Sequence, residues 1–187
     1  ITGITKFTQI SMFGMLNTLV NISFRNEYAA ICGFTKDEVI CNFSEHLSEL
    51  ADNNAITKSA LMDTMSSIYG GYHFSRGLIG VCNPFSVCNA LVNLRLNSYW
   101  IASGSNEMLL KVLRKFINEI PELDNCLIDS DYLEMSDVNM NDPKLFLYQF
   151  GYLTIKKVVG SSYMLGYPNR FLRHSQIFEQ LFVLINT

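Results

Sequence analysis

Helix-start signals recur along this chain of 187 residues, whereas the hairpin signal of a β-sheet is confined to one stretch. Thr35-Lys36-Asp37-Glu38 is a capping box, in which the Thr hydroxyl and the Glu carboxylate each satisfy a free backbone amide. The apolar stripe that follows the box, which includes Ile40 and Phe43, predicts one helix that Asn53-Asn54 ends. Thr57 precedes a second apolar stripe, which Gly70-Gly71 ends. Further starts are predicted at Asn83-Pro84, at Ser103 or Ser105, at Pro143 and at Arg170. The pattern predicts a mostly α, α+β fold.

The hairpin signal lies late in the chain. Residues 152–155 and 163–167 are rich in aromatic and β-branched side chains and bracket Gly160-Ser161. Together with the helices expected before and after it, this hairpin predicts a winged-helix-like unit over residues 143–187, and a helical subdomain is expected over 28–142. Residues 1–27 open on a short strand, Ile1 to Thr5, with no partner hairpin nearby. We therefore expect the chain to be part of a longer protein.

Composition excludes several classes of protein. Nearly half of the residues are hydrophobic and 17% are charged, which is typical of a folded domain and not of a disordered chain. No run of 18 apolar residues predicts a membrane span, and no leader pattern opens the chain, so a cytoplasmic protein without membrane contact is expected. The cysteines are odd in number and lack zinc-site spacing, which predicts reduced thiols and no metal site: Cys32, Cys41, Cys82, Cys88 and Cys126.

Catalytic motifs are absent from the sequence. It contains no phosphate-binding G-x-x-x-x-G-K-[ST], no G-x-S-x-G and no H-E-x-x-H. Cys82 or Cys88 with His73 could imitate a thiol–imidazole pair, but packing in the core is the better interpretation. We predict no catalytic residue, no complete active site and no cofactor within this chain.

Charge divides the second half of the chain. Residues 119–142 hold eight acids and no Lys or Arg, whereas residues 143–187 hold five bases and one acid. This change from an acidic to a basic stretch indicates either two complementary faces within one molecule or a basic surface that could bind phosphate. Lys156 and Lys157 on the hairpin, with Arg170 and Arg173 on the next helix, could bind DNA if the unit acts as a winged helix.

A series of strings makes the chain recognisable. They are Ile1-Thr2-Gly3, Lys6-Phe7, Leu16-Asn17, Gly33-Phe34-Thr35-x-x-Glu38, Tyr69-x-Gly71-Tyr72-x-Phe74, Asn83-Pro84-Phe85-Ser86, Tyr99-Trp100 with Ser103-Gly104, Leu147-Tyr148-Gln149-x-Gly151-Tyr152-Leu153-Thr154-Ile155 and Leu165-Gly166-Tyr167-Pro168-Asn169. In these the chain resembles the C-terminal half of the ATPase-like region of the bacterial AAA-ATPase-like family, P-loop proteins that often carry a C-terminal PD-(D/E)XK nuclease-like domain. The resemblance implies an upstream P-loop α/β core, of which residues 1–27 supply the last, orphan strand and exit segment. It also implies ATP and Mg²⁺ for the parent protein and a nuclease-like domain downstream.

The resemblance also implies candidate nucleotide-sensing residues. Thr2, and after it Thr5, would lie where a strand end senses the γ-phosphate, and Arg170 and Arg173 would be lid arginines. A strand Thr without a ligand, and arginines paired internally, are the alternative interpretations. The implied function is a non-catalytic lid and winged-helix-like segment that couples nucleotide state to the nuclease-like domain. The alternative is a winged-helix-like nucleic-acid-binding module using Lys156 and Lys157.

Overall fold

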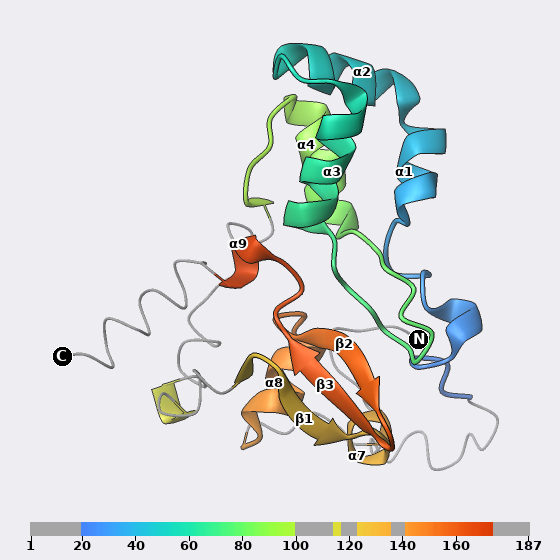
Figure 1. The fold of residues 1–187 in the computed structure, drawn as a ribbon, viewed down its shortest axis with the longest axis vertical. Helices are drawn as coiled ribbons and strands as arrows, with labels where there is room; N and C mark the ends of the chain where they lie inside the picture. The colour runs from blue at the N-terminus through green and yellow to red at the C-terminus, as the bar shows by residue number, and fades with distance from the viewer. Residues whose placement is uncertain (1–19, 100–113, 117–122, 136–140, 174–187) are drawn as a thin grey trace, which may run out of the picture.

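A computed structural model describes residues 20–99, 114–116, 123–135 and 141–173, and its elements form two groups (Figure 1). Four helices lie at one end: α1 (Lys36–Asn42), α2 (Ser44–Asn53), α3 (Lys58–Tyr69) and α4 (Pro84–Asn93). A three-stranded antiparallel sheet with its own helices lies at the other. Each end has its own cluster of buried hydrophobic residues. The α+β fold predicted from the sequence is confirmed.

The helical end is built from locally encoded helix starts. Thr35 and Glu38 form the predicted capping box: the Thr35 hydroxyl accepts from the Glu38 amide at 3.3 Å, and the Glu38 carboxylate accepts from the Thr35 amide at 2.8 Å. The hydroxyl of Thr57 caps α3, and the side chain of Asn83 caps α4 ahead of Pro84. These starts were predicted because each depends on neighbours within three residues.

One prediction for this end was wrong. The apolar stripe after Thr35 predicted a single helix that runs on to Asn53, but the helix breaks at Phe43, where φ is −121° and ψ is 27°. The Phe43 ring packs edge-on against Phe34, with 5.5 Å between centroids. Tertiary packing therefore overrides the helical period at this residue, and Ile40, expected on the apolar face, is 42% exposed.

The sheet has the order β1-β3-β2, from β1 (Cys126–Asp129), β2 (Thr154–Val159) and β3 (Ser162–Gly166). The predicted hairpin is confirmed: Val159 pairs with Ser162 around Gly160, whose φ of +59° favours glycine. A register shift between Ile155 and Lys157 marks a bulge in β2. At the other edge, the Lys144 ammonium donates to the Leu127 carbonyl of β1 at 3.1 Å.

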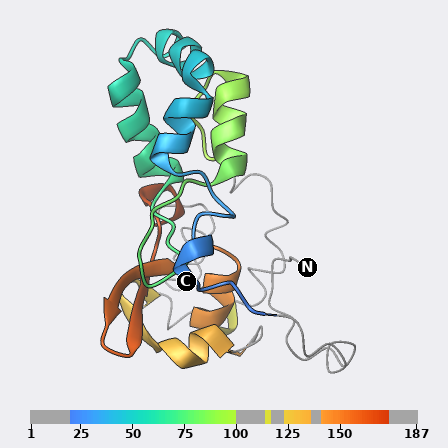
Figure 2. The ribbon, with the colours of Figure 1, turned by 90° about the vertical axis from the view of Figure 1, so that its right-hand side faces the viewer.

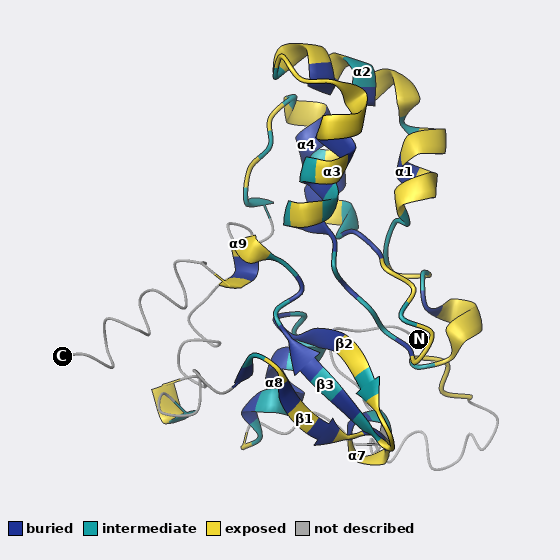
Figure 3. Cartoon of the chain, in the orientation of Figure 1, coloured by how far each residue is buried: buried dark blue, intermediate teal, exposed yellow. Residues whose placement is uncertain are grey.

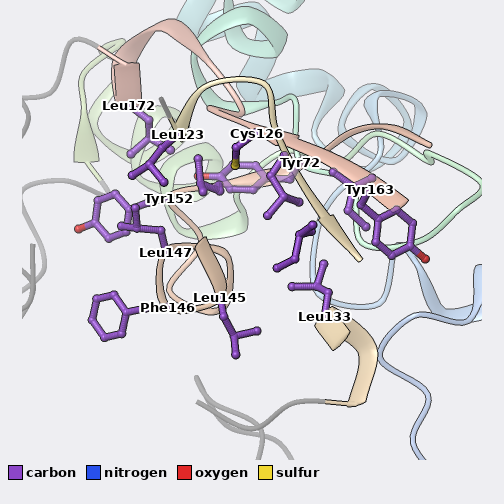
Figure 4. Packing of buried hydrophobic residues seen from close by; sticks show 14 of the residues in the cluster. Tyr72, Leu123, Cys126, Leu133, Leu145, Phe146, Leu147, Tyr152, Tyr163 and Leu172 are labelled. Atoms are coloured by element: carbon purple, nitrogen blue, oxygen red, sulfur yellow. The ribbon is translucent and has the colours of Figure 1, made fainter. Parts of the chain in front are cut away.

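Short helices complete the sheet end. α7 (Ser130–Met135) and α8 (Pro143–Gln149) lie between β1 and the hairpin, and α9 (Arg170–Arg173) follows it. Helices and a hairpin follow one another here in the order expected from the sequence; we call this end the winged-helix-like unit after that order alone, and its role stays a prediction. The unit takes in β1 and α7, which precede the boundary predicted at residue 142. Figure 4 shows its core, one buried cluster to which α8 contributes Leu145, Phe146 and Leu147, β3 contributes Tyr163 and α7 contributes Leu133.

Several predicted elements lie outside the described residues. They are the strand from Ile1 to Thr5, nearly all of the helix from Ser103 or Ser105, and the helix from Arg170 beyond residue 173. Two 3₁₀ turns, Asn26–Tyr28 and Arg114–Phe116, are described. Among the described helices, none has the length and apolar character needed to cross a membrane.

Candidate functional site

The two ends meet at the loop that leaves α3. Residues 70–82 run toward the sheet and back, held by bridges between Tyr72 and Val81 and between Phe34 and Cys82. Tyr72 and Val81 are buried in the core of the sheet end, whereas Tyr69 and Cys82 are buried in the helical core. In Figure 2 this green loop and the dark red α9 lie between the helices and the sheet. The loop therefore belongs to both cores.

The closest approach between the ends joins this loop to the connection between β3 and α9. Gly71 has a φ of +82°, and a β-carbon there would clash with the carbonyl oxygen of Pro168. The Asn169 side-chain amide donates to the carbonyl of Gly70 at 3.0 Å, and its oxygen accepts from the amide of Leu172 at 3.1 Å. One side chain therefore caps α9 and fastens it to the end of α3.

A pocket opens beside this contact. Its cavity volume is about 20 Å³, and it is lined by Ile68, Tyr69, Tyr72, Asn83, Ser86, Ser98, Asn169, Phe171 and Leu172. Ligand pockets usually span roughly 300–1,000 Å³, so this one is far too small for a nucleotide. Three of the recognisable strings, 69–74, 83–86 and 165–169, converge here. We call the contact of Gly70 and Gly71 with residues 168–172, together with this pocket, the junction. We take it as the candidate functional site.

Two of the predicted basic residues lie at the same junction. The Lys156 ammonium donates to the Pro168 carbonyl at 3.4 Å, and partial burial lowers the pKa of Lys156, an effect that Asp124 partly offsets. Arg173 forms an ion pair with Asp124, with 3.4 Å between Nη2 and Oδ2. The internal pairing considered for the arginines is thus present at Arg173, and Asp124 joins the acidic stretch to the basic one.

The other predicted residues are not brought to this contact. Lys157 on β2 and Arg170 on α9 are exposed. Thr2 and Thr5 lie outside the described residues. The nucleotide-sensing and nucleic-acid-binding roles of these residues remain predictions.

If this unit bound DNA as a winged helix, α8, the helix before the hairpin, would be a candidate to enter the groove, but its surroundings differ from those of a recognition helix. None of its seven residues is exposed; four are buried and three are intermediate (Figure 3). The ammonium of Lys144, the one basic residue of α8, donates a hydrogen bond to the carbonyl of Leu127. Recognition helices present side chains to base edges, and α8 presents its side chains to the core.

The thiol–imidazole alternative finds no geometric support. The backbone of His73 is tied to β2, with the His73 amide 2.7 Å from the Thr154 hydroxyl, which donates back to the His73 carbonyl at 3.0 Å. Burial, and next the Lys156 charge, lower the pKa of His73. Cys82 packs in the helical core and Cys88 lies exposed on α4. In the part of the chain that the structure describes, no group of three His, Cys, Asp or Glu could hold a metal ion.

Sequence reasoning missed three residues of the junction: Gly71, Asp124 and Asn169. Gly71 and Asn169 lie within the strings that carry the family resemblance, but that resemblance assigned no structural contact to either residue. Their contacts join residues far apart in sequence, which periodicity and local spacing do not report. For Asp124 the signal was the acidic stretch itself, which indicated complementary faces but no particular pair.

The fold and junction define a class: an α+β protein in which a four-helix subdomain and a winged-helix-like unit are fastened through one loop. No protein-family model and no solved structure matches the chain. The chain is similar to a protein of Azotobacter chroococcum mcd 1 described as an uncharacterized protein in the vnfD 5′ region, with 28% identity over 173 residues. The match covers 90% of this chain and 31% of that protein, so the chain spans about a third of its relative's length.

Proposed function

We propose that this chain is the non-catalytic C-terminal part of the ATPase-like region of a cytoplasmic, bacterial AAA-ATPase-like protein. In this role it couples the nucleotide state of an upstream P-loop core to the orientation of a downstream nuclease-like domain. The observation that carries the proposal is the junction, where α9 is tied to the end of α3. A lid transmits rigid-body motion only if its parts are fastened together.

The size of the relative supports the proposal. The match covers 31% of the Azotobacter protein, which leaves 100 − 31 = 69% outside it. That length is enough in total for a P-loop core and one further domain. The core would bind ATP and Mg²⁺, and Thr2, Thr5, Arg170 and Arg173 are the residues of this chain proposed to sense the nucleotide.

The junction also favours a lid over the alternative nucleic-acid-binding module. The side chains of α8 are turned into the core, Lys156 donates to a backbone carbonyl, and Arg173 is paired with Asp124. A DNA-binding surface needs cations that phosphate can reach. Two of the four predicted bases, Lys156 and Arg173, are engaged within the protein, although all four are exposed to solvent.

Nucleotide binding by the full-length gene product tests the proposal. We expect the sequence upstream of Ile1 to contain G-x-x-x-x-G-K-[ST] and the full-length protein to bind a fluorescent ATP analogue with Mg²⁺. Replacing the lysine of that motif by alanine should abolish binding, and Thr2→Val should alter hydrolysis more than binding. A full-length protein without the motif, or one that does not bind the analogue, would refute the proposal.

Exposure of Lys157 and Arg170 keeps the nucleic-acid module as a second candidate. It predicts that duplex DNA binds this chain at low salt, with an affinity that falls steeply as salt is added. Lys157→Gln combined with Arg170→Gln should then weaken binding and reduce the salt dependence. No change in fluorescence anisotropy of labelled DNA at low salt would exclude this function for the chain.

A further inference from the structure

The connection from β3 into α9, residues 166–173, is held from both ends of the molecule. We call it the latch segment. It begins in the sheet at Gly166, passes Pro168 and Asn169, and ends at Arg173, where α9 packs against α3. It therefore joins the hairpin covalently to α9, which in turn contacts the helical subdomain through α3.

The helical end holds the latch segment through backbone geometry. The carbonyl of Pro168 lies so close to Gly71 that only glycine fits there, and the positive φ of Gly71 imposes the same restriction. Asn169 adds the bond to the Gly70 carbonyl and keeps the Leu172 amide capped. Leu172 is 2% exposed, so the start of α9 is fixed in a buried setting.

The sheet end holds the same segment through charge. The carboxylate of Asp124 accepts from the amide of Tyr167 at 3.4 Å and pairs with the Arg173 guanidinium. The ammonium of Lys156, beside the bulge in β2, donates to the carbonyl of Pro168. The Pro168 carbonyl is thus contacted by Lys156 of the sheet and by the loop from α3.

We infer that Asn169 is a positioning residue that sets the angle of α9 against the helical subdomain, and with it the direction in which the chain continues from Arg173. Without the bond from Asn169 to Gly70, α9 stays capped but loses its side-chain hydrogen bond to the end of α3. The inference deepens the proposed function, on which it rests for the identity of the domain that follows. The orientation of α9 is a property of this chain alone.

Asn169→Asp separates the two roles of this side chain. The aspartate keeps an acceptor for the Leu172 amide but loses the donor to Gly70 and places a carboxylate beside that carbonyl. Asn83→Asp is the matched control, because Asn83 caps α4 by accepting from the Ser86 amide in the same way. Asn169→Ala, which removes both the cap and the bond, shows what the cap itself contributes.

Hydrogen exchange on the full 187-residue chain gives the first measurement. Asn169→Asp should raise exchange roughly tenfold at residues 66–72 and at 167–170, with β1 to β3 and α1 to α2 unchanged. Asn83→Asp should leave both junction segments as they are. Unchanged exchange at residues 66–72 in Asn169→Asp, or an equal rise throughout the chain, would overturn the inference.

A distance measurement tests the orientation directly and does not depend on nucleotide. Spin labels at Val92→Cys on α4 and Arg170→Cys on α9, with the exposed Cys32, Cys41 and Cys88 replaced by serine, report the angle between the two elements. The distance distribution should be narrow in the parent and in Asn83→Asp, and broad in Asn169→Asp. A narrow, unshifted distribution in Asn169→Asp would reject the positioning role, whereas failure of ATP binding would reject only the proposed function.

Discussion

The helical subdomain and the winged-helix-like unit are stabilised in different ways. In the helical subdomain, three of the four helix starts, those after Thr35, Thr57 and Asn83, are set by a side-chain cap within three residues, and α2 alone starts without one. In the winged-helix-like unit, β1 pairs with β3 across more than thirty residues, and Arg76 reaches Ser130 from the loop after α3. Local signals therefore specify the first region, while the second depends on contacts that form only when the chain closes.

Buried tyrosines make the two regions differ most at high pH. Burial raises the pKa of Tyr152 and Tyr163 to about 12 in the winged-helix-like unit, and that of Tyr69 to about 12 in the helical subdomain. Burial also raises the pKa of three further tyrosines, all packed at the sheet end: Tyr72, Tyr148 and Tyr167.

An acid with a raised pKa in the folded state stabilises the fold fully below the unfolded pKa, near 10, and loses that contribution as the pH rises through the folded value. We expect the sheet end to unfold first between pH 10 and 12, as followed by hydrogen exchange and tyrosinate absorbance. Tyr163→Phe should make stability less dependent on pH in this window. Earlier loss of the helical subdomain would contradict the comparison.

Core truncation should cost both regions a similar amount. Leu50 in the helical core and Leu145 in the sheet core are each 0% exposed. Leu50→Ala and Leu145→Ala should each lower the free energy of unfolding by about 3 kcal/mol in urea titrations. Exchange should rise mainly in the region that carries the substitution, and a rise spread evenly over both would show that the two cores unfold as one.

Two glycine substitutions measure how closely the regions approach. Gly71→Ala meets both a positive φ and the Pro168 carbonyl, whereas Gly160→Ala meets a positive φ of +59° with open space around it. We expect losses of about 3 kcal/mol for Gly71→Ala and about 1 kcal/mol for Gly160→Ala. Equal losses in urea unfolding would mean that the junction contact contributes nothing beyond backbone strain.

Cap removal tests the local signals of the helical subdomain. Thr35→Ala removes the hydroxyl half of the capping box and should cost about 1 kcal/mol of unfolding free energy. Thr35→Ser, which keeps the hydroxyl, is the control and should be nearly neutral. A cost near zero for Thr35→Ala would show that α1 is held by packing at Phe43 and Val39 instead of by its cap.

The smallest effect is expected for the ion pair at the junction. The Arg173 side chain is 61% exposed, so its pair with Asp124 is screened by solvent. Arg173→Gln should lower the free energy of unfolding by about 0.5 kcal/mol or less at low salt, and salt should remove the difference. A larger loss that persists at high salt would contradict a solvent-screened pair.

The same contrast explains what the sequence could predict. Caps and the Gly160 turn were predictable because their partners are sequence neighbours. The break at Phe43 was not predictable, because the helical period continues through it and the contact of its ring with Phe34 leaves no mark on that period. The six-residue helix α7 is too short for a period to reveal. At the candidate site, the charge swing indicated internal pairing, but the approach of Pro168 to Gly71 has no local signature.

The lysines at the borders of the sheet have a consequence for assembly. Within the sheet that the structure describes, β1 and β2 are the outer strands, and outer strands attract additional chains by offering free backbone groups. To pair with β1, a strand from another chain would have to displace the Lys144 ammonium from the Leu127 carbonyl. At β2, it would meet the irregular register between Ile155 and Lys157 and two adjacent positive charges. Both borders therefore resist growth of the sheet into a polymer, even at high protein concentration.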